Sequence, residues 1–215
     1  MRTDDLITTL ARQADPVRPL APPWIRLTGW LVAAIALPLA AIAILGPRHD
    51  LGSVAGQPWF VWTMSLVICL AACAAGAALV LVIPGAVGVG ALRGVSLASF
   101  GLWSATLVAS IGRGGQGFAA VSDWPVCFSI VSAISLVPAV WLLVLLRRAA
   151  PLHYGWTGSL ALAAAAAVGA TAIQVICPQN DPAHALLGHF GPVLAAGGLG
   201  ALAGRRLVTR ATDRV

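Results

Sequence analysis

Hydrophobic residues gather along the chain in six long runs, separated by short segments rich in glycine, proline and polar residues. The runs are Leu27–Leu45, Phe60–Ile83, Val95–Ile111, Val126–Leu146, Trp156–Ile176 and Leu186–Ala203. Each is close to the roughly 20 residues that an α-helix needs to cross a bilayer core of about 30 Å. The pattern therefore predicts an all-α fold, a polytopic membrane bundle of six transmembrane helices.

The composition excludes an ordinary water-soluble domain. Of the 215 residues, 59% are hydrophobic and 9% are charged, whereas soluble domains carry about 25% charged residues. The first run begins behind a polar segment of some 25 residues, which is unlike a cleavable signal peptide. We therefore expect the first helix to be retained.

The arginines predict the orientation of the bundle. Every one of the 13 basic residues is an arginine. When the two sides of the bilayer are numbered alternately, one side carries only Arg48 and Arg113. The other side carries Arg2, Arg12, Arg18, Arg26, Arg93, Arg147, Arg148, Arg205, Arg206, Arg210 and Arg214. Because cytoplasmic segments retain positive charge, we expect both termini in the cytoplasm. The high pI is explained in this way, and we expect no direct contact with nucleic acid.

Two of the four cysteines are predicted to meet at the outer surface. Cys127 opens the fourth run and Cys177 closes the fifth, and the two arms of this hairpin have nearly equal length. At 1.5 Å rise per residue, the two thiols return to nearly the same height. If the arms touch, the sulfur atoms fall within the range of a disulfide or a shared metal ion. Cys69 and Cys73 lie four apart in the middle of the second run, where a thiol behaves as a small apolar side chain.

The residues around this pair suggest roles. Pro125 and a capping Asp123 would place Cys127 at a helix N-terminus, where the helix dipole favours the thiolate. We therefore expect Cys127 to be the nucleophile and Cys177 its resolving partner. His184 lies seven residues beyond Cys177, and Cys127, Cys177 and His184 form a candidate ligand set for zinc, cadmium or another soft metal. Asp181, and His189 one turn further along, could add ligands to it. A redox or metal sensor, a static disulfide and two unrelated thiols all remain open.

The N-terminal segment predicts a docking helix. Leu6, Ile7 and Leu10 fall on one helical face, with Asp4 and Asp5 in the first turn. So short a helix is marginal by itself, and its apolar face needs the bilayer or a protein partner. Two adjacent acids disfavour an anionic lipid surface, so a protein partner is favoured.

The opening Met1-Arg2-Thr3-Asp4-Asp5-Leu6-Ile7 resembles the N-terminus of NrsF-type proteins, which are six-helix membrane anti-sigma factors of bacteria. A cysteine that opens the fourth span and a Cys-Pro pair after the fifth extend the resemblance. It implies a non-enzymatic, cofactor-free regulator of transcription in a stress response, placed in the inner membrane. Asp4, Asp5, Leu6, Ile7 and Leu10 would hold an extracytoplasmic-function sigma factor. Cys127 and Cys177 would sense a heavy metal, bound as the signal, or an oxidant.

On this interpretation the chain has three parts. Residues 1–23 form the cytoplasmic segment that binds the sigma factor, 24–205 the transmembrane domain and 206–215 a basic cytoplasmic tail. The alternative is a membrane thiol oxidoreductase that uses a quinone, or a small-solute carrier. The lack of a CxxC motif weakens the first. A carrier would need a polar cavity lined by hydroxyl side chains of the third run, namely Ser96, Ser99, Ser104, Thr106 and Ser110.

Overall fold

The computed structural model describes residues 2–13, 20–113, 123–149 and 153–208, and this part of the chain is helical without a strand. The elements are α1 (Thr3–Gln13), α2 (Pro23–Leu45), α3 (Leu51–Val54), α4 (Pro58–Leu81), α5 (Val89–Ile111), α6 (Trp124–Arg147), α7 (Tyr154–Ile176), α8 (Pro182–His184), the π-helix η2 (Ala185–Phe190) and α9 (Gly191–Val208). Six helices are long and apolar enough to cross a membrane, the last being the continuous run Pro182–Val208. The predicted all-α bundle of six spanning helices is confirmed.

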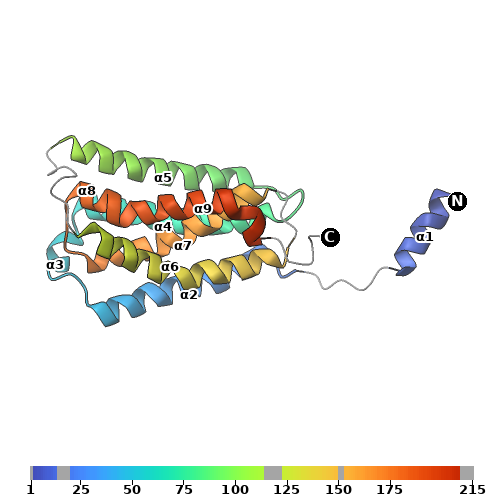
Figure 1. Cartoon of the computed structure of the whole chain (residues 1–215), viewed down its shortest axis with the longest axis horizontal. Helices are drawn as coiled ribbons and strands as arrows, with labels where there is room; N and C mark the ends of the chain where they lie inside the picture. The colour runs from blue at the N-terminus through green and yellow to red at the C-terminus, as the bar shows by residue number, and fades with distance from the viewer. Residues whose placement is uncertain (1, 14–19, 114–122, 150–152, 209–215) are drawn as a thin grey trace.

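Helices α4 and α7 form the centre of the bundle (Figure 1). In the most apolar stretch of α7, 72% of the residues are buried, against 11% in α2. α7 packs on α4, α6 and α9, and its buried face is built largely from alanine and glycine. Small side chains let helix backbones approach closely, which stabilises helix packing where the surrounding lipid is itself apolar.

The closest approach in the centre joins α7 to α9. A Cβ atom added at Gly200 would lie only 2.2 Å from the carbonyl oxygen of Gly158, and one added at Gly204 would lie 2.3 Å from that of Tyr154. The two backbones are therefore in direct contact. No residue other than glycine fits at these crossing points.

All six spanning helices begin earlier than the hydrophobic pattern predicts, and α5 differs most. α5 begins at Val89 rather than Val95 because Gly88, with φ +83°, turns the chain into the helix from the left-handed region. Arg93 therefore lies within α5, where its guanidinium sits 4.4 Å from the ring centroid of Trp156. The last spanning helix begins at Pro182 rather than Leu186, since the side chain of Asp181 caps it.

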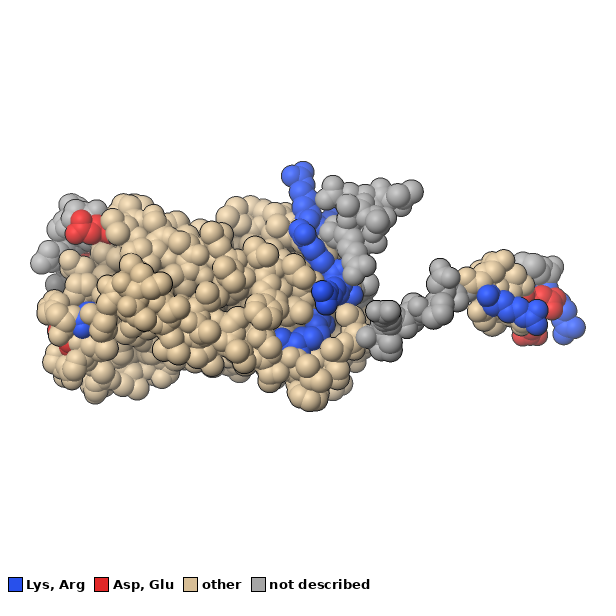
Figure 2. Space-filling model, turned by 90° about the horizontal axis from the view of Figure 1, so that it is seen from below, with Lys and Arg blue, Asp and Glu red and all other residues tan. Residues whose placement is uncertain are grey.

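Most arginines of the described part of the bundle gather at one end, as Figure 2 shows. At this end the first spanning helix begins and the last one finishes (Figure 1). α1 lies apart from the bundle. Arg18, Arg210 and Arg214, with most of the basic tail, fall outside the described residues.

Candidate functional site

The two cysteines predicted to meet do so at the end of the bundle opposite the arginines. Cys127 lies in the first turns of α6, after Pro125, and Cys177 forms the C-cap of α7. The Sγ atoms are 3.5 Å apart, and both cysteines are free thiols. α6 and α7 are consecutive and packed together, so the hairpin argument placed the thiols correctly.

Two histidines complete a cluster around the thiols. His184 Nε2 lies 3.5 Å from the Sγ atom of Cys177. The ring of His189 stands edge-on to that of His184, with centroids 5.4 Å apart. One donor atom from each of Cys127, Cys177, His184 and His189 lies within 4.8 Å of the others, and all four residues are buried. We call these four residues the thiol–histidine cluster.

The π-helix η2 explains why His189 joins the cluster. His189 follows His184 by five positions, which in an α-helix turns the two side chains about 140° apart. The hydrogen bonds of a π-helix join residues five positions apart, and η2 spans Ala185–Phe190. Gly188 lets this wider turn approach α6, since a Cβ atom there would lie 3.1 Å from the Cβ of Cys127. η2 therefore brings both histidines, and not His184 alone, to the thiols.

The first turn of the segment that carries His184 is fixed by its own cap. The Asp181 carboxylate accepts hydrogen bonds from the backbone N–H groups of Ala183 and His184, at 2.9 and 3.1 Å. Pro182 follows the cap at the first helical position, where its missing N–H costs nothing. The turn from Cys177 to His184 is thus short and rigid. Asp181 serves here as a cap, not as a ligand of the cluster.

Hydrogen-bond donors converge on the sulfur of Cys177. The Cys127 thiol donates toward Cys177. This hydrogen bond lowers the pKa of Cys177; burial opposes it, and His189 and the backbone N–H of Gln179 reinforce it. The arrangement favours Cys177 as the thiolate, and the roles of nucleophile and resolving partner stay a prediction. Asp123 does take the N-cap position of α6, but without a side-chain hydrogen bond to the first turn.

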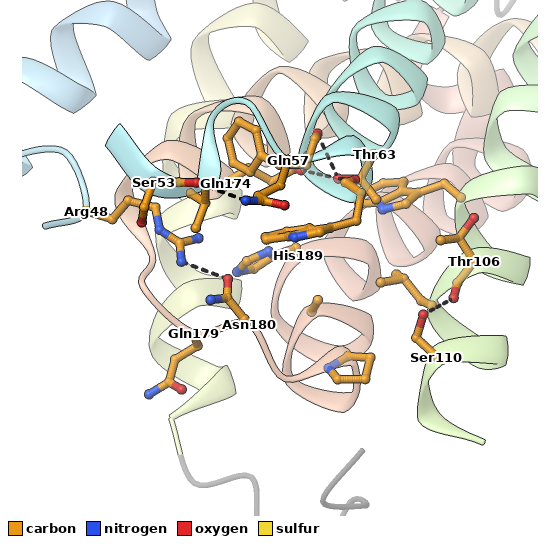
Figure 3. A pocket seen from close by; sticks show the side chains of 17 residues that line it. Arg48, Ser53, Gln57, Thr63, Thr106, Ser110, Gln174, Gln179, Asn180 and His189 are labelled. Carbon is orange, nitrogen blue, oxygen red and sulfur yellow. Dashed lines mark hydrogen bonds between the residues drawn. The ribbon is translucent and has the colours of Figure 1, made fainter. Parts of the chain in front are cut away.

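A buried arginine locks the loop that carries Cys177. Arg48 forms a bidentate ion pair with Asp50, with distances of 2.6 and 2.8 Å. Its Nη2 atom also donates to the Pro178 carbonyl at 3.2 Å and to Asn180 Oδ1 at 2.7 Å (Figure 3). The ion pair lowers the pKa of Asp50 to about 2, since Arg48 donates to its carboxylate. Arg48 therefore ties the connection after α2 to the loop after α7.

The donor set of the cluster suits a soft metal ion. Two thiolates and two imidazoles are a common tetrahedral set for zinc, and with Zn–S bonds of about 2.3 Å the two sulfur atoms stand about 3.8 Å apart. The observed separation of 3.5 Å is close to this value. The same sulfurs would have to approach to about 2.0 Å to form a disulfide. Metal binding thus needs little movement, while oxidation draws α6 and α7 together.

Comparison with known proteins gives the family. A family model described as "Negative regulator of sigma F" (NrsF) matches residues 10–209. The chain belongs to the NrsF family. It is 29% identical over 184 residues to a probable anti-sigma-F factor NrsF of Azospira oryzae, a match that covers 83% of this chain and 85% of the relative. No solved structure matches the chain. Membership of NrsF, an anti-sigma factor family, indicates a regulatory role and implies a sigma factor as partner.

The predicted sigma-binding residues all lie on α1. Its acidic residues Asp4 and Asp5 fall in the first turn, and no residue of the helix is buried. Leu6, Ile7 and Leu10 are 41%, 59% and 57% exposed. Nothing in the bundle covers them, and their contact with a sigma factor stays a prediction for this NrsF protein.

The hydroxyl groups expected to line a carrier's cavity are mostly turned to their own helix. Ser96, Ser104, Thr106 and Ser110 each donate to a carbonyl of α5 three or four residues earlier. Of the expected set, only Thr106 and Ser110 line the cavity described below. Cys69 and Cys73, with sulfur atoms 3.9 Å apart in α4, are not part of the thiol–histidine cluster.

Proposed function

We propose that this NrsF protein is an inner-membrane anti-sigma factor whose thiol–histidine cluster senses a heavy metal or an oxidant. In the resting state the cytoplasmic N-terminal segment, residues 1–23, holds an extracytoplasmic-function sigma factor. The signal at Cys127 and Cys177 lowers the affinity of that segment for the sigma factor. The observation that carries this proposal is the convergence of two thiols and two imidazoles within 4.8 Å at one end of the bundle.

The orientation in this proposal rests on charge. The cluster lies at the end opposite the arginine-rich end of the bundle. Positively charged segments stay in the cytoplasm, so the cluster faces the periplasm, where metals and oxidants arrive first. Residues 206–215, which begin with the last turn of α9, add further arginines to the cytoplasmic side.

A soft metal would be held by Cys127, Cys177 and His184, with His189 as the fourth donor. Thiolate and imidazole ligands favour zinc and cadmium over hard cations. Binding releases the thiol proton of Cys127, since the metal takes the thiolate form. The ion is the signal in this scheme, not a resident cofactor.

Oxidation would use the same atoms. The Cys177 thiolate attacks a peroxide and takes one oxygen to form a sulfenic acid, while the second oxygen leaves as hydroxide or alkoxide. Cys127 then attacks that sulfur, an S–S bond forms and the sulfenic oxygen leaves as water, with the departing proton supplied by the Cys127 thiol. His184, beside Cys177, is placed to carry this proton.

The signal must reach the cytoplasmic end through the packing of helices. The cluster joins the start of α6, the end of α7 and η2, and α7 contacts α4, α6 and α9. Tenfold release of the sigma factor requires about 1.4 kcal/mol of coupling between the two ends. The bundle would therefore need two packings with only a small difference in free energy.

The test is co-purification of the full-length protein with its sigma factor from membranes, with and without cadmium or peroxide. Wild type should release the sigma factor, whereas Cys127→Ser and Cys177→Ser should keep it bound. Cys69→Ser is the matched control, because it removes a thiol outside the cluster, and it should respond like wild type. Release from Cys127→Ser at wild-type concentrations of both signals would refute the sensing role.

A further inference from the structure

A large cavity lies directly beside the thiol–histidine cluster. It has a volume of about 570 Å³ and lies between the ends of α4, α5 and α7 and the segment that carries the histidines. His189 belongs to both, because it lines the cavity and is one of the four donors of the cluster (Figure 3). The volume falls within the range of small-molecule sites. We call it the outer cavity.

The charges at the outer cavity are already neutralised. Arg48 lines it, but its guanidinium is paired with Asp50 and donates to Asn180. An incoming anion would have to displace Asp50 from its arginine partner. The cavity therefore favours an uncharged occupant.

Two buried nitrogen atoms that line the outer cavity have no hydrogen-bond partner in the described part of the chain. They are Gln174 Nε2 and His189 Nε2. Both residues are more than nine-tenths buried, with exposures of 8% and 5%. The oxygen of the Gln174 amide already accepts from Thr63 at 3.1 Å, so the amide nitrogen is the group left over. Buried donors are seldom left without an acceptor unless a ligand or water supplies one.

Part of the remaining wall is aromatic. Trp59, Phe60 and Trp103 line the cavity, and the last two are buried to more than nine-tenths. Aromatic walls favour flat rings, which stack or meet them edge to face. Such aromatic side chains beside the unpaired Gln174 amide donor favour a flat molecule that carries an acceptor.

We propose that the outer cavity binds an uncharged planar ring bearing a carbonyl group, the chemistry shared by aromatic ketones and membrane quinones. The carbonyl oxygen accepts from the Gln174 amide. When a metal ion occupies the other ring nitrogen of His189, the same oxygen also accepts from His189 Nε2–H. The ring lies against Phe60 and Trp103. The site is distinct from the thiols themselves, and no covalent step is involved.

Through His189 this ligand would regulate the cluster, an inference that rests on the proposed function. An imidazole that binds a metal through one ring nitrogen donates from the other, and loss of that outer acceptor commonly costs 10- to 100-fold in metal affinity. The ligand's oxygen would supply the acceptor that His189 lacks. By linkage, the metal strengthens binding of the ring by the same factor.

The first test is binding of tritiated 9-fluorenone to the full chain in lipid nanodiscs, measured above empty nanodiscs. Fluorenone is planar, uncharged and unreactive toward thiols, and fluorene is the same skeleton without the carbonyl. We expect one saturable site per chain, with fluorene at least tenfold weaker as a competitor. No saturable binding, or equal competition by fluorene, would overturn the proposal. If duroquinone competes with fluorenone, the site is assigned to membrane quinones. If duroquinone does not compete, the site is assigned to ketones from the periplasm. Both outcomes support the proposed chemistry.

Substitutions test the placement of the ring. Gln174→Leu keeps the volume and removes the unpaired donor, so fluorenone should bind at least tenfold more weakly. Gln57→Leu is the matched control, because this glutamine also lines the cavity but is exposed and already donates to the Ser53 carbonyl. It should bind within twofold of wild type. Thermal unfolding, followed by the loss of helical signal, shows whether each variant is folded. If a folded Gln174→Leu variant bound fluorenone with wild-type affinity, the site would be refuted.

The coupling is tested by titrating cadmium with and without saturating fluorenone. The cadmium affinity should rise about tenfold or more in wild type and remain unchanged by the ligand in His189→Phe. An identical affinity with and without fluorenone would refute the regulation. If cadmium and peroxide failed to release the sigma factor, the proposed function would be refuted instead. The two failures are distinguishable, because binding of the ring to the cavity is measured without a sigma factor.

Discussion

Replacing Arg48 by methionine should loosen the loop that carries Cys177 and His184. Methionine keeps the apolar part of the side chain but cannot donate to the Pro178 carbonyl or to Asn180. The backbone hydrogen bond from Arg48 to Val175, at 2.9 Å, remains. The variant therefore removes only the side-chain part of the contact between the two loops.

The magnitude follows from the two lost bonds. A hydrogen bond from a charged donor contributes about 1.5 kcal/mol at the lower end of its range, so the closed loop loses about 3 kcal/mol. That corresponds to an increase on the order of a hundredfold in the open population. Asp50 stays partly exposed, with 27% of its side chain accessible, and water can take the place of its partner.

Hydrogen exchange measures this opening. The amides of Ala183 and His184 are protected by Asp181 within the same loop, and their protection factors should fall by up to a hundredfold in Arg48→Met. Arg113→Met is the matched control, because Arg113 is the other arginine at the end of the bundle that carries the thiol–histidine cluster, and it is exposed. Unchanged protection in Arg48→Met, or an equal fall in the control, would show that Arg48 does not hold the loop.

Three further predictions concern packing, pH and partner binding. Gly200→Ala should lower the free energy of unfolding by about 1–3 kcal/mol or more, since its Cβ would enter backbone space; Gly198→Ala, with nothing within 4 Å, should be neutral or stabilising in the same melts. The pKa of Asp50, held at about 2 by its arginine partner, lies below its unfolded value of about 3.9, so its contribution is present above pH 4 and is lost as pH falls toward 2. Melting temperatures of wild type should fall through that window more than those of Asp50→Asn, and parallel curves would contradict the ion pair's role. Leu10→Asp should abolish co-purification of the sigma factor while Thr8→Asp, on another face of α1, retains it; equal binding of both variants would exclude the apolar face.

The spanning helices and the meeting of Cys127 with Cys177 followed from the sequence. Both depend on local quantities: the length of an apolar run, the rise of a helix and the near-equal arms of one hairpin. The segregation of arginines to one end of the bundle has the same origin, because each charge marks a short connection between two spans. Arg93 shows where such arguments fail, since a charged residue can lie inside a helix when Trp156 shields its guanidinium.

The tertiary structure decided the chemistry of the site. His189 enters the cluster only because a π-helical turn replaces an α-helical one, and that turn needs Gly188 against α6. Cys177 rather than Cys127 receives the converging donors, because residues from three segments meet at its sulfur. The outer cavity and its two unpaired nitrogen atoms arise in the same way, from side chains that are far apart along the chain. Helix length is set within each run, whereas the register of a helix and the charge of a thiol depend on neighbours that only the folded bundle brings together.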